Sequence, residues 1–163
     1  MRRAIFFDRD GILNREIGNY VCKVEDFELL TDAVECIQIA KKSGFMVFII
    51  TNQGGIAKKL YTHEDLKIFH HKILNATDFK VDEIFYCPHH PEISNCICRK
   101  PDSLMLEKAI AKYQLDKKKC FMIGDTPRDI QAAEKAGIKG LLVQPNSDKI
   151  HLLKEQITII LNN

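Results

Sequence analysis

The stretch RAIFFDRDG, residues 3–11, places an apolar run directly before two aspartates and a glycine. A short run of Ala, Ile and Phe without polar alternation predicts a strand buried on both faces, as in a parallel sheet. If Asp8 ends this strand and Gly11 permits a sharp turn, Asp8 and Asp10 face one pocket beyond the strand's carboxyl end. The stretch therefore predicts an α/β fold with a carboxylate site beside its first strand.

The rest of the chain alternates similar apolar runs with helical patterns. Further strands are predicted at 45–51, 82–87, 119–124 and 138–143. Helices are predicted at 32–43, 63–75, 103–114, 127–136 and 147–161. This alternation predicts right-handed crossovers and a Rossmann-like doubly wound parallel sheet. No linker, repeat or low-complexity segment interrupts it, so we expect a single domain over residues 1–163.

Composition narrows the class of protein. The formal charge of the 163 residues is +2, and the run 117–119 of three lysines is interpreted as a solvated turn, so nucleic acid is not an expected partner. The start, MRRAIFFDRDG, lacks an apolar stretch long enough for a signal peptide or a membrane span. We therefore expect a cytoplasmic protein with reduced thiols and no membrane partner, and a monomer.

A third carboxylate, Asp125, follows the strand predicted at 119–124. Three carboxylates at one edge of a sheet repel one another unless a cation lies among them, and hard oxygen ligands favour Mg²⁺. Such a site suits phosphoryl transfer, in which one aspartate forms an aspartyl phosphate and a second moves protons. A phosphoryl group at this site can be contacted by Thr51, by the backbone N–H groups of the turn at 52–55 and by the side chain of Lys100.

The order of these motifs resembles the haloacid dehalogenase (HAD) superfamily of phosphohydrolases, over essentially the whole chain. The matching stretches are FFDRDGILN at 6–14, TNQGGIA at 51–57, CPHHP with CICRKP within 87–101, and GDTPRDIQAA at 124–133. Within the superfamily the sequence is most similar to the group that contains heptose 1,7-bisphosphate 7-phosphatases and histidinol-phosphate phosphatases. The short interval between Asp10 and Thr51 leaves no room for a large cap domain.

The resemblance implies a role for each matching residue. Asp8 is the implied nucleophile and Asp10 the general acid and base, while Thr51 and Lys100 hold the transferring phosphoryl group. Mg²⁺ is implied on the carboxylates of Asp8 and Asp125 and the carbonyl of Asp10, with Asp129 supporting the metal loop. The family usually has threonine where this chain has Ile12, and we expect activity to survive that change.

Cysteine and histidine cluster in the stretch 87–98. Cys87, His89, Cys96 and Cys98 provide three sulfurs and one nitrogen, a complete tetrahedral set for structural Zn²⁺. His90 is the rival ligand, and the family pattern favours His89. A disulfide is disfavoured in a reducing compartment. We expect this zinc loop to order the stretch and to fix the residues Arg99 and Lys100 that follow it.

Two substrates are compatible with the sequence. Arg99 suits a phosphate by its planar fork of donors, and the family implies sugar contacts at Glu16, Gly18 and Asn19. Substrate contacts are also implied for Asn52, Gln53 and Gly54. By this resemblance, Arg99 and the segment 15–30 favour the 7-phosphate of D-glycero-D-manno-heptose 1,7-bisphosphate as the substrate. The short loop between His89 and Cys96 instead resembles the histidinol-phosphate group.

Non-enzymatic alternatives also follow from the pattern. A receiver-type signalling domain uses an acidic pocket, Mg²⁺ and a phosphorylated aspartate, but there the acidic pair and the acceptor lie on separate strands. A zinc-stabilised binding module with an inactive site is favoured only by Ile12. The sequence therefore predicts a Mg²⁺-dependent phosphomonoester hydrolase ahead of both.

Overall fold

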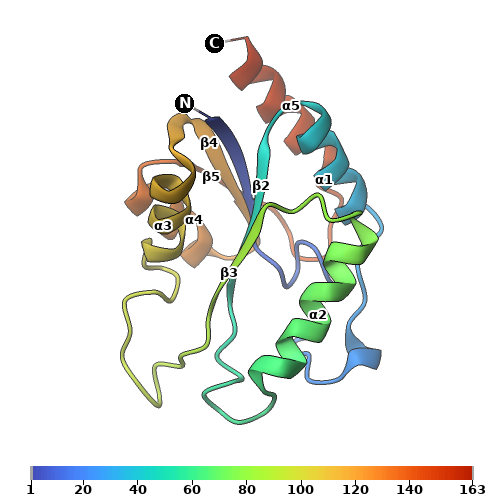
Figure 1. Cartoon of the computed structure of the whole chain (residues 1–163), viewed down its shortest axis with the longest axis vertical. Coiled ribbons are helices and arrows are strands. Elements are labelled where there is room, and N and C mark those ends of the chain that lie inside the picture. Colours follow the sequence, from blue (N-terminus) through green and yellow to red (C-terminus); the bar gives the residue numbers. More distant parts are fainter. Residues whose placement is uncertain (1, 163) are drawn as a thin grey trace.

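The computed structural model describes residues 2–162 and is built on a five-stranded sheet in the order β3-β2-β1-β4-β5 (Figure 1). Every neighbouring pair of strands is parallel. The strands are β1 (Arg2–Phe7), β2 (Met46–Asn52), β3 (Glu83–Cys87), β4 (Leu115–Gly124) and β5 (Lys139–Leu142). The chain winds outward from β1 to β3 and then returns to the other side of β1, which confirms the predicted doubly wound fold.

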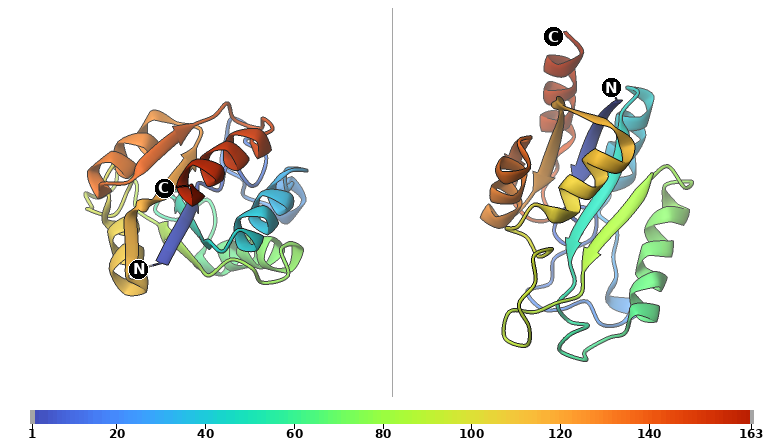
Figure 2. Two further views of the ribbon diagram at one scale, coloured as in Figure 1. Left: turned by 90° about the horizontal axis from the view of Figure 1, so that it is seen from above. Right: turned by 60° about the vertical axis from the view of Figure 1, so that its left-hand side comes forward.

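Helices cover both faces of this sheet (Figures 1 and 2). They are α1 (Ala33–Lys42), α2 (His63–Ala76), α3 (Leu104–Tyr113), α4 (Pro127–Ala136) and α5 (Ile150–Leu161), with a short 3-10 helix η1 (Val24–Asp26). Helices α1, α2 and α5 share one apolar cluster with Ile5 and Phe7 of β1. Helices α3 and α4 share the other cluster with Ala4 and Phe6.

The position of β1, at the centre of the sheet, explains why its sequence is apolar without alternation. Residues 4–7 are completely buried, and their side chains point alternately into the two clusters. Burying an Ile or Phe side chain stabilises the fold by about 1.5–3 kcal/mol, so the central strand is a major source of stability. A strand of this kind can lie only between two layers of helices.

Most predicted boundaries agree with the structure to within one or two residues. Helix α4 begins after Thr126 in a capping box with Asp129 and ends at Gly137, whose φ is +76°. The prediction for the lysine run 117–119 is wrong, because these residues belong to β4. They are exposed there, and Leu115 pairs with Arg2 on the far side of a register shift, which extends the strand beyond its apolar part.

The connections leave the carboxyl edge of the sheet open. Between β1 and β2 the described chain contains only η1 and α1, and between β2 and β3 only α2. This agrees with the expectation that no large cap covers the site. None of the helices within residues 2–162 is long and apolar enough to cross a membrane.

Candidate active site and metal centres

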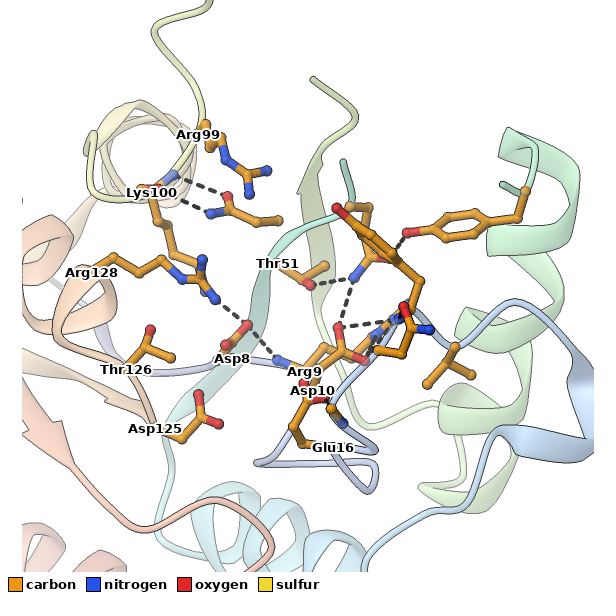
Figure 3. Close-up of a pocket in the computed structure, with 17 residues that line it drawn as sticks. Asp8, Arg9, Asp10, Glu16, Thr51, Arg99, Lys100, Asp125, Thr126 and Arg128 are labelled. Atoms are coloured by element: carbon orange, nitrogen blue, oxygen red, sulfur yellow. Dashed lines mark hydrogen bonds and ion pairs between the residues drawn. The ribbon is translucent and has the colours of Figure 1, made fainter. Parts of the chain in front are cut away.

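A cavity of about 480 Å³ opens beyond the carboxyl ends of β1, β2 and β4, beside the point where the strand order reverses (Figure 3). The predicted site residues that line it are Asp8, Asp10, Glu16, Gly18, Asn19, Thr51, Asn52, Gln53, Arg99, Lys100 and Asp125. Asp129 lies fully buried against the same group of carboxylates. Residues more than a hundred positions apart are thus brought to one place, as predicted from their positions at the carboxyl ends of the strands.

Asp8 and Lys100 form the buried centre of this site. The Lys100 ammonium lies 2.7 Å from Asp8 Oδ1 and 2.6 Å from Asp129 Oδ1, and it donates to the Ile50 carbonyl at 2.8 Å. Burial raises the pKa of Asp8 to about 7, although Lys100 opposes the rise. Burial alone would also raise the pKa of Asp129, but Lys100 and Thr126 bring it below its ordinary value. One ammonium therefore compensates two buried carboxylates.

Asp10 is held in a different way. Arg9 Nη2 donates to both carboxylate oxygens, at 2.8 and 3.0 Å, and Asn14 and Gln53 each donate at 2.9 Å. Burial alone would raise the pKa of Asp10, but these partners, Arg9 first, lower it below its ordinary value. The pKa of Asp8 is thus raised and that of Asp10 lowered, as expected for two carboxylates with different tasks.

The amide of Gln53 connects several residues of the cavity wall. Its Nε2 donates to Thr51 Oγ1 at 2.7 Å as well as to Asp10, and its Oε1 accepts from the Tyr61 hydroxyl at 2.6 Å. Its backbone N–H donates to the Cys87 carbonyl at 2.7 Å, so that group is engaged with the sheet. Gln53 therefore holds Thr51 and Asp10 relative to each other.

Asp8, Asp125 and Asp129 each bring one carboxylate oxygen to a cluster whose three oxygens lie within 4.8 Å of one another. Gly11 makes the close approach of Asp125 possible, since its φ is +80° and a Cβ there would collide with the Asp125 carboxylate. Burial, followed by the charge of Asp129, raises the pKa of Asp125 to about 6. Crowded carboxylates facing a glycine turn have the hard oxygen ligands and the unmet negative charge that a Mg²⁺ site requires.

The cysteine cluster has the spacing of a tetrahedral metal site. Cys87 Sγ lies 3.2 Å from Cys98 Sγ and 3.6 Å from Cys96 Sγ, and His89 Nδ1 lies 3.4 Å from Cys98 Sγ. Ligands about 2.3 Å from a tetrahedral zinc ion lie roughly 3.8 Å apart, close to these distances. The rival ligand His90 instead accepts a hydrogen bond from the backbone N–H of Glu92. All four predicted ligands, with His89 rather than His90, therefore converge on one point.

The cysteine cluster is joined directly to the active site. Arg99 Nη1 donates to the His89 carbonyl at 3.0 Å. Asn52 pairs with the backbone of Lys100 through both of its side-chain groups, each at 3.0 Å. Gly54 lies against the same loop, because a Cβ there would come within 3.1 Å of Arg99 Nη1. Lys100 is thus fixed from the cluster on one side and from the end of β2 on the other.

Several residues of the cavity wall were not predicted. They are Arg9, Tyr20, Val21, Tyr61, Thr126 and Arg128. Arg128 had a signal in the sequence, because it stands in the first turn of a predicted helix, where the helix dipole disfavours a cation. The tyrosines had none, since Tyr61 lies in a loop and Tyr20 faces it only in the folded chain, with their rings 6.4 Å apart.

Known proteins are similar to this chain in both sequence and fold. The family model described as HAD-hyrolase-like matches residues 97–163. A D-glycero-alpha-D-manno-heptose-1,7-bisphosphate 7-phosphatase of Campylobacter jejuni is 39% identical, over 90% of this chain and 84% of its own. A D-glycero-D-manno-heptose-1,7-bisphosphate 7-phosphatase of Chlorobaculum tepidum is 36% identical, over 94% and 84%.

A solved structure shares the fold of this chain. The D,D-heptose 1,7-bisphosphate phosphatase of B. bronchiseptica, crystallised with magnesium and phosphate, superimposes with a TM-score of 0.83 at 31% identity. The match covers 94% of this chain and 86% of that one. The chain belongs to the HAD-like phosphatases, in the family whose members include these heptose-bisphosphate phosphatases.

Proposed function

We propose that this phosphatase removes the 7-phosphate of D-glycero-D-manno-heptose 1,7-bisphosphate in a Mg²⁺-dependent reaction through an aspartyl phosphate on Asp8. The observation that carries the proposal is the pairing of Asp8 with Lys100 at 2.7 Å, beside Asp125 and at the base of an open cavity. The names of the related proteins support the choice of substrate.

Each group at the base of the cavity has a step to perform in the proposed reaction. A carboxylate oxygen of Asp8 attacks phosphorus, and Lys100 and Thr51 donate hydrogen bonds to the phosphoryl oxygens. Asp8 and Asp125, with the carbonyl of Asp10, would hold Mg²⁺, and the bound ion neutralises charge on the nucleophile and the phosphate. Asp8 then returns as a free carboxylate when water cleaves the aspartyl phosphate.

Asp10 moves the protons in this scheme. Its lowered pKa keeps it ionised, the form that takes a proton from the hydrolytic water. In the preceding step Asp10 must be protonated, with a proton taken up from solvent, so that it can give that proton to the leaving alkoxide. Its pair with Arg9 has to loosen when it takes up this proton. Gln53, which donates to both Asp10 and Thr51, keeps the carboxylate next to the phosphoryl site during the change.

Two guanidinium groups favour a substrate with a second phosphate. Arg99 and Arg128 both line the cavity beside Lys100 (Figure 3), and neither is part of the Asp8–Lys100–Asp129 centre. A planar guanidinium suits bidentate binding of a phosphate. Histidinol phosphate remains the second candidate, because the loop between His89 and Cys96 is short.

The cysteine cluster completes the proposal as a structural zinc site. Cys87, His89, Cys96 and Cys98 form a closed set of four ligands with no position left for a reacting water. The ion would supply ordering free energy to a loop in which 91–95 are exposed. Its expected effect on turnover is indirect, through the placement of Arg99 and Lys100.

A side-by-side turnover comparison tests the function. Purified protein with Mg²⁺ is assayed for phosphate release from the α and β anomers of heptose 1,7-bisphosphate, from heptose 7-phosphate and from histidinol phosphate. We expect the highest kcat/KM with a bisphosphate, and loss of all release in Asp8→Asn. A preference for histidinol phosphate would overturn the substrate, and full activity of Asp8→Asn would overturn the mechanism.

A further inference from the structure

The segment Glu16–Asn19 lies in the cavity wall, yet it is tied to a residue 130 positions away. The backbone N–H of Glu16 donates to Asn146 Oδ1 at 2.7 Å, and Asn146 Nδ2 donates to the Glu16 carbonyl at 3.0 Å. The side chain of Asn146 therefore meets both backbone groups of Glu16, as a neighbouring strand would.

The backbone of Asn146 makes a second connection. Its N–H donates to the Gly11 carbonyl at 2.8 Å, and its φ of +60° is a left-handed conformation that asparagine tolerates better than most residues. Pro145 supports the same contact, since its Cβ lies 3.3 Å from the position of a Cβ on Gly11. Asn146, in the loop after β5, thus holds both the glycine turn of the carboxylate site and the start of the segment 16–19.

The remaining hydrogen bonds of this segment are local. Gly18 N–H donates to Glu16 Oε1 at 2.6 Å, and Tyr20 N–H donates to Asn19 Oδ1 at 2.8 Å. Glu16, Gly18 and Asn19 are half-buried or exposed, so apolar burial does little to fix them. Among the described residues, Asn146 is the partner that ties the segment to the rest of the fold by hydrogen bonds.

We propose that Asn146 is a positioning residue for substrate binding, which rests on the proposed function because 16–19 is the proposed sugar-facing segment. Asn146 orders this segment before substrate arrives, so binding does not have to order it. Its loss should weaken binding of a sugar bisphosphate. It should leave untouched the hydrolysis of a small aryl phosphate, which reaches the carboxylate site and Lys100 without needing the segment.

The variant Asn146→Gly isolates the side chain. Glycine keeps the left-handed conformation and the N–H bond to Gly11 but removes both bonds to Glu16. Ser147→Gly is the matched control, since it introduces glycine at the next position and removes a hydroxyl that bonds only to the Gln144 carbonyl. Hydrogen exchange of the Glu16 amide, followed by NMR, is compared between the two variants. Their kinetics with heptose 1,7-bisphosphate and p-nitrophenyl phosphate are compared as well.

In Asn146→Gly we expect about a tenfold rise in KM for the bisphosphate, the size of two modest hydrogen bonds. The kcat for the bisphosphate and the hydrolysis of p-nitrophenyl phosphate should stay at the level of Ser147→Gly, and the Glu16 amide should exchange faster. If Asn146→Gly does not fold, Asn146→Asp replaces it, because it keeps the acceptor for Glu16 N–H and loses the donor.

Two results would overturn the proposal. One is an unchanged exchange rate at Glu16, and the other is an equal loss on both substrates, which would indicate a merely structural role. The proposed function fails separately, if the wild-type protein does not prefer heptose bisphosphate. In that case the exchange measurement still decides whether Asn146 orders the segment.

Discussion

Replacing Lys100 by methionine removes the one ammonium between two buried carboxylates. Lys100 is only 2% exposed, and its Nζ has three oxygen partners within 2.8 Å, on Asp8, Asp129 and Ile50. Methionine fills similar volume, so the change deletes charge and hydrogen bonds more than packing. The two carboxylates are then left buried without their compensating charge.

The structure gives the size and the pH dependence of this loss. Breaking a buried ion pair by removing one partner costs about 3–5 kcal/mol of folding free energy. Burial raises the pKa of Asp8 to about 7, although the charge of Lys100 lowers it. Without Lys100 this pKa rises further. A carboxyl with a raised folded pKa binds protons more tightly in the folded state, so stability falls as pH rises. We expect a larger deficit at pH 8 than at pH 5.5.

Lys149→Met is the matched control for this experiment. Lys149 is 1% exposed and pairs with Asp32 at 2.7 Å, away from the cavity. Urea unfolding in magnesium-free buffer, without a chelator that would empty the proposed zinc site, should show that both variants are destabilised. Phosphate release with Mg²⁺ should fall by about 10²–10³-fold only in Lys100→Met.

The reasoning on Lys100 has a clear refutation. If Lys100→Met unfolds at the wild-type urea concentration at pH 8, the ion pairs with Asp8 and Asp129 contribute no net stability. If instead Lys149→Met loses as much turnover as Lys100→Met, the loss comes from destabilisation and Lys100 has no special place at the phosphoryl site.

Three further perturbations follow from the same structure. Cys96→Ser should lower bound zinc, measured by metal analysis, and reduce turnover through Lys100; retention of one zinc per chain together with full turnover would show that Cys96 is not a zinc ligand. Gly11→Ala should raise the Mg²⁺ concentration for half-maximal activity, because its Cβ collides with Asp125, whereas Gly137→Ala, with a similar positive φ but no such clash, should not. Burial lowers the pKa of His70 to about 3, so protons bind the unfolded chain better and stability falls below pH 6.5. Between pH 7 and 5 the wild-type protein should lose about 2 kcal/mol more than His70→Gln in urea unfolding, and identical losses would show that His70 titrates normally.

Local pattern was sufficient to predict the layers of this fold and the ends of its strands. The apolar runs before Asp8, Thr51 and Asp125 set β1, β2 and β4, and parallel strands bring their ends to one edge. The ligand pairs of 87–98 were equally visible, because close spacing of soft ligands is itself a signal.

What the sequence did not predict depends on contacts between distant segments. Tyr61 bonds to Gln53 and Asn146 bonds to Glu16, and neither pair has a spacing that a helix or strand imposes. The start of β4 was missed for a similar reason. Its exposed lysines lie in the register shift between the Leu115–Arg2 and Cys120–Ala4 pairs, so they show no apolar pattern, and the pairing of Leu115 with Arg2 has no signal in the local sequence. Side-chain partners of this kind become visible only once the chain is folded.

The double pairing of Asn52 with Lys100 limits where this protein can change length. From Cys98 to Lys100 the chain is held by the ligand cluster at one end and by Asn52 at the other, so an inserted residue would move the ammonium away from Asp8. The stretch 91–95 is exposed and lies between the two ligand pairs, so it can lengthen at small entropic cost. Loops that reach new substrates, or a peptide tag, are best inserted there.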